Sequence, residues 1–279
     1  MTTAGSDPDV VGRNPFDAPA GYTGERLAAD DPRFRPDLAR HFAAYELVGP
    51  LVAGQRVLEA GCGEGYGAAI LARHAAHVVG ADYDETAIGL AQLRHAAPHV
   101  EFRAIDLREL AEHAPGTFDT VTNFQVLEHL VDPTPFLRAA AACLRPGGRL
   151  ILTTPNRLAS VSENPFHVHE YVADELRDLI GRFFARVEMQ GIVGTERVYA
   201  FEAARGARVR RILRLDPLGL RRLLPRSIVE FAFSRLALLV RSQVARDSAD
   251  VVALEPGDFR VAAAEPPQFL DHLVIAHRG

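Results

Sequence analysis

The chain has 279 residues and a formal net charge of −5 at pH 7, which argues against a general nucleic-acid-binding protein because such proteins carry an excess of basic side chains. Hydrophobic residues make up 48% of the sequence, enough for the core of one elaborated domain. Two cysteines, Cys62 and Cys143, predict no disulfide framework. The sequence has no apolar signal segment and no apolar run of membrane-spanning length, so we expect a cytoplasmic protein.

The N-terminal segment, residues 1–48, is predicted to end in a cap helix. Residues 1–20 are rich in Gly, Pro and Asp, a composition typical of disordered or loosely draped chain. Residues 37–48 carry apolar side chains at helical spacing, including Leu38, Phe42 and Tyr45.

Strands and helices are predicted to alternate through the core, residues 49–191, as in a Rossmann-like fold. Alternation of this kind indicates a doubly wound α/β domain with a mostly parallel sheet. With a last strand in 263–279, we expect seven strands, at 56–59, 77–82, 100–104, 118–123, 149–154, 186–191 and 270–276. The expected helices between them are 68–74, 85–96, 107–111, 135–144 and 172–182.

Residues 192–262 form a predicted helical insertion, or lid, before the last strand. Residues 205–226 are rich in arginine, and residues 228–240 are largely apolar. Three interpretations remain open for the segment 205–240. It could be a solvated lid face, bind an anionic substrate, or rest weakly on a membrane surface as an amphipathic helix.

A glycine-rich turn follows the first predicted strand. The pattern E-x-G-x-G-x-G begins at Glu59 and places Gly61, Gly63, Gly65 and Gly67 at alternate positions. A strand, a glycine turn and a helix in succession suit a nucleotide-like ligand, because glycine lets the backbone bend sharply and lets a ligand approach closely. The G-x-G-x-x-G/A spacing of dinucleotide-binding proteins is met only marginally. An NAD-dependent oxidoreductase therefore remains an alternative, as does a turn without a ligand.

Two acidic residues follow the next strands. Asp82 ends the second predicted strand, and Asp106 follows the third. Because parallel strands share one carboxyl edge, both side chains should lie at one crevice. Asp82 could accept hydrogen bonds from ribose hydroxyls and Asp106 from an adenine amino group. The alternative is that each caps the helix that follows it.

Together these segments resemble the class I S-adenosylmethionine (SAM) methyltransferases, in the group often labelled methyltransferase type 11. The resemblance runs from about residue 21 to 191, through the glycine turn and segments 79–83, 118–121, 144–148 and 153–156. It implies SAM as the cofactor and a set of cofactor-binding residues. It assigns Gly61, Cys62 and Gly63 to the methionine end, Asp82 and Tyr83 to the ribose, and Asp106 and Leu107 to adenine. Glu59 and Asn123, at the ends of the first and fourth predicted strands, complete the set.

The segment 125–129 deserves separate consideration because related methyltransferases can carry E-x-x-E-H here, and some of these then bind a divalent cation. Gln125, Glu128 and His129 share one face of a predicted helical turn. Gln125 replaces the first glutamate and removes one anionic oxygen, which weakens a site for a hard cation. We therefore predict no metal, and His129 is either a base or a capping histidine.

The catalytic candidates are His167, His129 and Glu170, on loops that follow the fourth and fifth strands. A hydroxyl acceptor benefits from a general base, and histidine suits that role near neutral pH. We favour His167, because Glu170 could fix its tautomer. The alternative is that His167 and Glu170 only connect loops by hydrogen bonds.

The sequence thus predicts a SAM-dependent methyltransferase acting on a hydroxyl of a sugar, an oligosaccharide or another small molecule. Residues 164–170 resemble a subgroup that often methylates sugars, polysaccharides or isoprenoid-linked molecules, and the mycofactocin oligosaccharide methyltransferases are a related group. Alternatives are methylation of a nitrogen or carbon of a small metabolite, and a non-catalytic SAM-binding subunit. A nucleic-acid amino-methyltransferase would carry Asn/Asp-Pro-Pro-aromatic after the fourth strand, where Asn123-Phe-Gln125 stands, so no nucleic-acid partner is expected. The sequence does not specify the oligomeric state.

Overall fold

The computed structural model describes residues 34–160, 164, 166–214, 235, 254–263 and 269–279. Their centre is an eight-stranded sheet in the order β3-β2-β1-β4-β5-β8-β6-β7. The strands are β1 (Arg56–Ala60), β2 (His77–Asp82), β3 (Val100–Ala104), β4 (Phe118–Phe124), β5 (Leu144–Pro155), β6 (Arg186–Gly194), β7 (Phe259–Ala263) and β8 (Asp271–His277).

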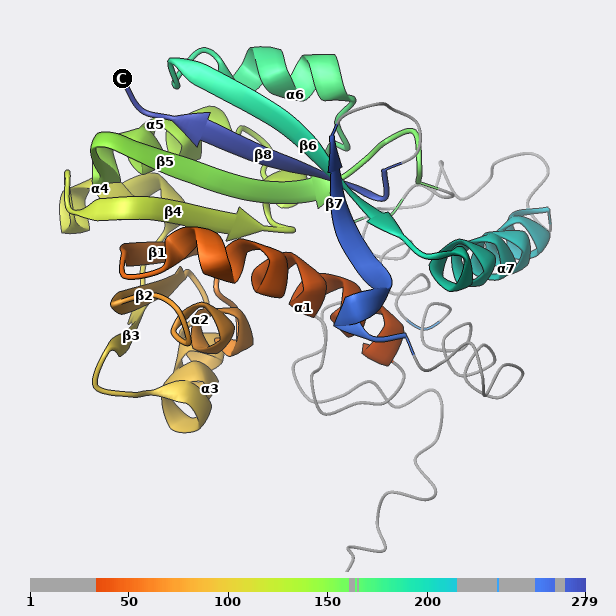
Figure 1. Cartoon of the computed structure of the whole chain (residues 1–279), viewed down its shortest axis with the longest axis horizontal. Coiled ribbons are helices and arrows are strands. Elements are labelled where there is room, and N and C mark those ends of the chain that lie inside the picture. The colour runs from red at the N-terminus through yellow and green to blue at the C-terminus, as the bar shows by residue number, and fades with distance from the viewer. Residues whose placement is uncertain (1–33, 161–163, 165, 215–234, 236–253, 264–268) are drawn as a thin grey trace, which may run out of the picture.

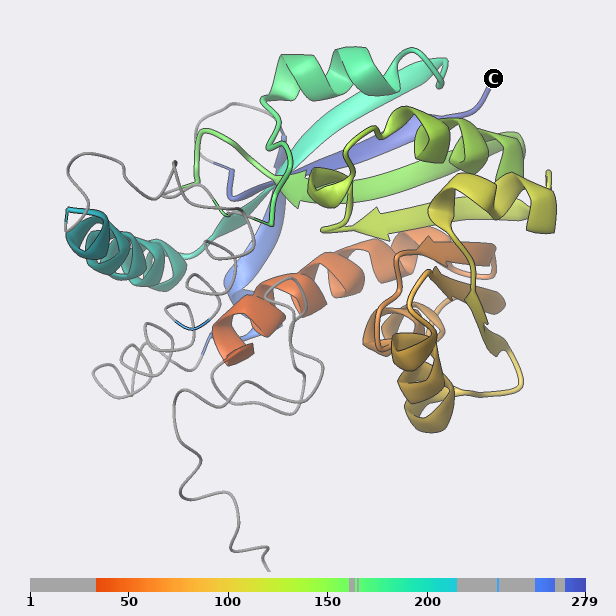
Figure 2. The ribbon, with the colours of Figure 1, turned by 180° about the vertical axis from the view of Figure 1, so that it is seen from behind.

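Helices cover both faces of the sheet, as the doubly wound prediction requires. One apolar cluster joins α1, α2, α3 and α7 to one face, and a second joins α4, α5 and α6 to the other (Figures 1 and 2). The helices are α1 (Arg35–Val48), α2 (Tyr66–Leu71), α3 (Glu85–His95), α4 (Leu110–His113), α5 (Thr134–Cys143), α6 (Ala173–Ile180) and α7 (Glu196–Leu213).

The strand order reverses beside β1, and this reversal positions the site. From β1, the chain winds through β2 to β3 on one side and through β4 to β5 on the other, and all these pairs are parallel. The carboxyl ends of β1 and β4 therefore lie side by side, with their following loops leaving in opposite directions. A crevice at such a switch point is where doubly wound folds bind ligands.

The sheet has one strand more than the seven that the sequence predicts. The extra strand is β7, which falls within the predicted helical insertion 192–262 except for its last residue, Ala263. It pairs antiparallel with β6 at the edge of the sheet. The described part of that insertion thus contains both a helix, α7, and a strand. Residues 215–234 and 236–253, which hold most of the predicted apolar run, lie outside the described residues, as do residues 1–33. No helix among the described residues is long and apolar enough to cross a membrane.

Strand β6 extends three residues beyond its predicted end at Gly191. Gly191 pairs with Ala262 of β7 and His272 of β8, so the ladder continues through it. A Cβ at Gly191 would lie 2.0 Å from the ring of Phe269. This glycine therefore makes room for an aromatic ring and does not end the strand.

An ion pair between Arg40 and Asp271 of β8 holds helix α1 against the sheet. Arg40 Nε donates to Asp271 Oδ2 at 2.5 Å, and Asp271 is only 1% exposed. Arg205 of α7 also forms an ion pair with Asp37 of α1, at 2.8 Å. These contacts hold α1 over the carboxyl edge, where its side chains form one wall of the site.

Candidate active site

The glycine turn between β1 and α2 forms the floor of the site. Gly63 has φ 52°, in the left-handed region that favours glycine, and its N–H donates to Asp82 Oδ2 at 2.9 Å. A Cβ at Gly67 would lie 2.2 Å from both Glu59 Oε1 and the ring of Tyr45. The alternating glycines therefore serve two needs, a left-handed backbone at Gly63 and a close helix approach at Gly67.

A pocket opens above this turn. It is bounded by α1, the turn, the end of β2 and the segment after β4. Its lining residues are His41, Tyr45, Gly61, Cys62, Gly63, Glu64, Tyr66, Asp82, Phe124, Gln125, Val126 and His129. The structure thus brings together four of the predicted cofactor-binding residues, Gly61, Cys62, Gly63 and Asp82, and one predicted catalytic residue, His129.

The other predicted cofactor-binding residues do not line this pocket. Tyr83 is 69% exposed, and Leu107 is buried in the core. Asp106 caps a short 3₁₀ helix, Leu107–Glu109, and its carboxylate accepts two hydrogen bonds from the Arg108 guanidinium, at 2.9 and 2.6 Å. These hydrogen bonds lower the pKa of Asp106.

Asn123 is fully buried and connects strands rather than lining the pocket. Its Nδ2 donates to the carbonyl of Ala60 at 2.8 Å. Ala60 ends β1 directly before the glycine turn, so Asn123 stabilises the backbone from which the turn departs.

Glu59 lies beneath the pocket wall and is 1% exposed. Its Oε1 accepts a hydrogen bond from Tyr45 Oη at 2.6 Å, while Oε2 has no hydrogen-bond partner within the described residues. Burial raises the pKa of Glu59 to about 8, although the Tyr45 hydrogen bond opposes the shift, and the nearby charge of Asp82 adds to it. Glu59 therefore carries a proton at neutral pH in the folded protein.

We expect this raised pKa to make the ligand-free protein less stable at higher pH. An unfolded glutamate has a pKa of about 4.5 and the folded Glu59 about 8, so between these values the folded state holds a proton that the unfolded state has released. The free energy of unfolding should therefore fall as pH rises through this window. Glu59→Gln should remove that decline, and denaturant unfolding of both proteins between pH 5 and pH 9 measures it. A difference between them that is constant with pH would contradict the prediction.

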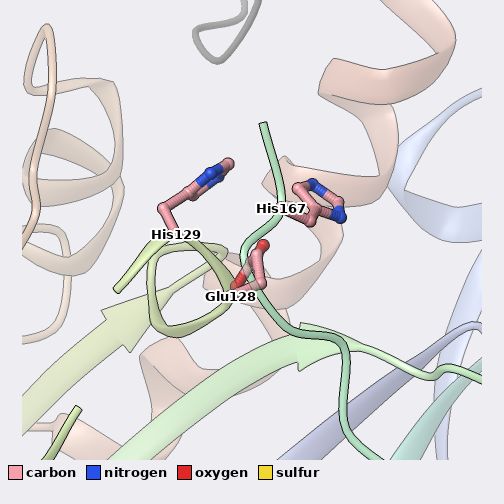
Figure 3. Close-up of side chains that lie close together, drawn as sticks. All are labelled: Glu128, His129 and His167. Atoms are coloured by element: carbon pink, nitrogen blue, oxygen red, sulfur yellow. The ribbon is translucent and has the colours of Figure 1, made fainter. Parts of the chain in front are cut away.

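Two further side chains, Glu128 and His167, gather around His129 at one end of the pocket (Figure 3). Glu128 and His129 belong to a 3₁₀ helix, Leu127–His129, after β4, and His167 comes from the loop between β5 and α6. One nitrogen or oxygen atom from each of the three lies within 4.8 Å of the other two. The rings of His129 and His167 meet edge to face, with centroids 5.0 Å apart.

Hydrogen bonds fix each member of this cluster. His167 Nδ1 lies 2.6 Å from Glu170 Oε1, and His129 Nδ1 lies 3.0 Å from the carbonyl oxygen of Phe166. Glu128 is 1% exposed, and its Oε2 accepts from Thr154 Oγ1 at 2.9 Å. Burial raises the pKa of Glu128, and its two histidine neighbours oppose the shift. The predicted trio of His129, His167 and Glu170 is thus in one place, together with a buried carboxylate.

Backbone hydrogen bonds hold the segment after β4 against the loop between β5 and α6. The carbonyl oxygen of Glu128 accepts hydrogen bonds from the N–H groups of Val168 and His169, at 2.7 and 3.2 Å.

Gln125, two residues before the 3₁₀ helix, has φ 55° and is the non-glycine residue with a left-handed backbone in the described part of the chain. This unusual conformation turns the chain sharply from β4 into the pocket wall.

The aromatic wall on α1 was not predicted from the sequence as part of the site. His41 Nδ1 lies 3.0 Å from Tyr66 Oη, and burial lowers the pKa of His41 to about 4, so its imidazole is neutral at physiological pH. The ring centroids of Tyr45 and Phe124 are 4.7 Å apart. The helical spacing of apolar residues identified Tyr45 as an apolar position of α1. The sequence could not show which face of α1 lines the pocket, because that depends on how α1 packs over the glycine turn.

The sequence is similar to known methyltransferases over the residues that form this site. A family model described as a methyltransferase domain matches residues 32–193, which includes the glycine turn, the pocket and the histidine cluster. A probable S-adenosylmethionine-dependent methyltransferase of Mycobacterium tuberculosis is 40% identical over 193 residues, covering 67% of this chain and 69% of the relative.

Two further similarities extend the comparison, one to a curated protein and one to a solved structure. The ubiquinone biosynthesis O-methyltransferase of Xanthomonas euvesicatoria is 39% identical over 124 residues, covering 44% of this chain and 52% of that protein. Among solved structures, a SAM-dependent methyltransferase of Thermotoga maritima, a possible histamine N-methyltransferase, is similar with a TM-score of 0.55 and 15% identity. That match covers 88% of this chain and 92% of that one, and at this identity it supports the fold alone.

Proposed function

We propose that this chain, which belongs to the class I SAM-dependent methyltransferases, transfers the methyl group of its cofactor to a hydroxyl of a sugar or another small hydroxylated molecule. Family membership and the use of SAM as methyl donor rest on the match over residues 32–193 and on the mycobacterial relatives. They decide against the alternative of an NAD-dependent oxidoreductase. The choice of a hydroxyl acceptor is the proposal.

The observation that carries the proposal is the cluster of Glu128, His129 and His167 beside the cofactor pocket. An alcohol is a weak nucleophile until its proton leaves, so a hydroxyl acceptor needs a group nearby that favours the deprotonated form. Amine acceptors that are already neutral need less help of this kind. The pairing of His167 Nδ1 with Glu170 fixes the orientation of the imidazole beside the pocket.

The pocket also suits a polar acceptor. His41 and Tyr66 offer an imidazole and a phenol group, and Tyr45, whose hydroxyl is hydrogen-bonded to Glu59, adds an aromatic ring. Sugars bind through hydrogen bonds at their hydroxyls and through contacts of their C–H faces with aromatic rings. An oligosaccharide acceptor, of the type used by the mycofactocin oligosaccharide methyltransferases, is the narrower form of the proposal. The name of the Xanthomonas relative also specifies O-methylation for that protein.

For the cofactor, we propose that the methionine end lies on Gly61, Cys62 and Gly63 and that Asp82 accepts from the ribose. These residues line one continuous part of the pocket. Such a placement puts the transferred methyl group between the glycine turn and His129, which also lines the pocket. Methyl transfer is an in-line displacement, and it needs the acceptor oxygen held at about 3–3.5 Å from the methyl carbon.

The test is to identify the product. The purified protein is incubated with isotopically labelled SAM and an extract of hydroxylated small molecules and glycans, and labelled products are isolated and examined by NMR. We expect a methyl ether, because the acceptor is a hydroxyl. A methyl group on nitrogen or carbon would overturn the choice of acceptor atom. Binding of SAM without transfer to any compound, across acceptors of all three kinds, would favour the non-catalytic alternative.

A further inference from the structure

Helices α1 and α2 bring a hydrogen-bonded pair of side chains to the pocket wall. His41 Nδ1 lies 3.0 Å from Tyr66 Oη, and both residues line the pocket. Within the described part of the chain, each of these two side chains has the other as its hydrogen-bond partner. Neither the placement of the cofactor nor the deprotonation of the acceptor gives this pair a task.

The position of the pair is fixed from two sides. The ring of Tyr66 packs edge to face against the rings of Phe42 and Tyr45, with centroids 5.3 and 6.0 Å apart. Arg40, the residue before His41, forms the ion pair that holds α1 against β8. Side chains that are already fixed lose little conformational freedom when they bind a ligand, so the pair is preorganised for recognition.

Both members of the pair are uncharged at neutral pH. Burial lowers the pKa of His41 to about 4, although the charge of Asp271 opposes the shift. Burial raises the pKa of Tyr66, so its hydroxyl keeps its proton. The pair therefore offers no positive charge to a carboxylate or a phosphate, and no negative charge to an ammonium group.

The hydrogen-bonding capacity that remains in the pair matches a hydroxyl group. In a neutral imidazole one nitrogen donates and the other accepts, and a phenol hydroxyl does both. If Tyr66 donates to His41 Nδ1, the pair keeps the Nε2–H donor and the phenol oxygen as acceptor. If His41 Nδ1 donates, the pair keeps the phenol O–H donor and Nε2 as acceptor. An alcohol also both donates and accepts, whereas a carboxylate only accepts and an ammonium group only donates.

The reacting hydroxyl does not account for this pair. In the proposed function the reacting hydroxyl lies beside His129, in the segment after β4, whereas the pair comes from α1 and α2. His129 is near enough for its positive charge to lower the pKa of His41, so one small molecule can reach both. An acceptor that fills the pocket displaces water from the pair, and polar groups that are left without a partner cost free energy.

We propose that His41 and Tyr66 together bind a second hydroxyl of the acceptor, one that is not methylated. The inference rests on the proposed function, because it takes methyl transfer to a hydroxyl as its premise, and it narrows the acceptor to a neutral polyol. An alcohol or a phenol with one hydroxyl would leave the pair unsatisfied, so the pair selects against such acceptors. By holding the second hydroxyl, the pair also determines which hydroxyl meets the methyl group.

The first test is the structure of the product. The full chain is incubated with labelled SAM and the extract of hydroxylated molecules and glycans, and NMR locates the methyl group and the free hydroxyls of each labelled product. We expect a methyl ether that keeps at least one free hydroxyl. A methyl ether without another hydroxyl would overturn this inference and leave the proposed function intact. A methyl group on nitrogen or carbon would remove both.

The second test compares the isolated acceptor with analogues that each lack one of its unreacted hydroxyls. For the unmodified protein we expect one analogue to lose at least about a hundredfold in kcat/KM, because a site that hydrogen-bonds a substrate hydroxyl rejects the analogue without it by up to roughly 10⁵. If every analogue reacts as well as the acceptor, the inference fails.

The variant Tyr66→Phe keeps the aromatic ring and removes the hydroxyl. Its kcat/KM should fall about tenfold with the acceptor, the value of one hydrogen bond, and should change little with the analogue that lacks the second hydroxyl. The preference for that hydroxyl should therefore shrink. Equal losses with the acceptor and with the analogue would show a structural role and overturn the inference.

The variant His41→Ala and the double variant test whether the two residues act as a pair. Side chains that bind one hydroxyl together show losses that do not add, so the double variant should lose about as much as the more damaged single variant. Losses that add would overturn the joint role. SAM affinity, measured by calorimetry, should stay unchanged. A loss of SAM affinity as large as the loss with the acceptor would assign the pair to the cofactor and overturn the inference.

The matched control is Tyr199→Phe. Tyr199 lies on α7, is 39% exposed and does not line the pocket. The substitution removes a phenol hydroxyl elsewhere on the protein, so this variant should keep the preference of the unmodified protein for the second hydroxyl. The same reduced preference in Tyr199→Phe as in Tyr66→Phe would count against a specific role of the pair.

Discussion

Replacing His167 with alanine should lower kcat for methyl transfer by roughly 10²–10⁴-fold, the usual cost of removing a group that assists proton loss. The physical reason is that the acceptor hydroxyl would lose a member of the cluster that favours its deprotonated form. Affinity for SAM should change little, because His167 does not line the part of the pocket formed by the glycine turn. A loss in kcat without a loss in cofactor binding identifies an interaction made at the reacting group.

The measurement is steady-state kinetics with the identified acceptor, alongside calorimetry with SAM. His129→Ala should give a loss of the same order, whereas His169→Ala should behave like the unmodified protein. Losses below about tenfold for both His167→Ala and His129→Ala would remove the cluster from the reaction. The enzyme would then act by holding the acceptor and the methyl group in line.

Replacing Asp82 with alanine should weaken SAM binding by about tenfold to a hundredfold. A hydrogen bond to a charged group is worth about 1.5–3 kcal/mol, which corresponds to that range. In the structure Asp82 Oδ2 already accepts from the N–H of Gly63 and Oδ1 from that of Asp84, at 2.9 and 3.1 Å. The substitution would therefore remove a ribose partner and also loosen the turn on which the methionine end rests.

The matched comparison is Asp106→Ala, measured by the same calorimetry. The carboxylate of Asp106 is already bonded to Arg108 and to a backbone N–H, and the side chain does not line the pocket, so we expect a smaller effect. Thermal unfolding without ligand shows whether either variant has lost stability. If Asp82→Ala binds SAM as tightly as the unmodified protein, the ribose assignment fails.

The sequence predicted most of the sheet because its signals are local. Short apolar runs between turns and amphipathic segments predicted β2 and β3 with the bounds that the structure shows. The alternation of strands and helices predicted the doubly wound topology. Strand β7 was missed because it is only five residues long and lies almost wholly within residues 192–262, which the sequence predicts to be helical. The predicted strand stops at Gly191, because the sequence does not show that the ring of Phe269 fills the space beside this glycine.

The cofactor side of the site was predictable for the same reason, since the glycine turn and Asp82 follow directly from strand ends. The acceptor side depends on packing between distant segments. His41 and Tyr45 face the pocket because α1 packs over the sheet, where Arg40 pairs with Asp271 of β8 and Asp37 with Arg205 of α7. The sequence did place His129 and His167 on neighbouring loops, because β4 and β5 are adjacent. The role of Glu128 as the buried member of their cluster became visible only in three dimensions.

The position of β8 has a consequence for how the chain is synthesised. This strand is the last of the eight along the chain, yet it lies inside the sheet, between β5 and β6. A growing chain on the ribosome therefore completes β5 and β6 long before residues 271–277 arrive to join them. Until then each presents an unpaired edge, which is a template for association with other chains. Any truncation that removes β8 would divide the sheet in two rather than shorten it, and the incomplete product should depend on chaperones to stay unaggregated.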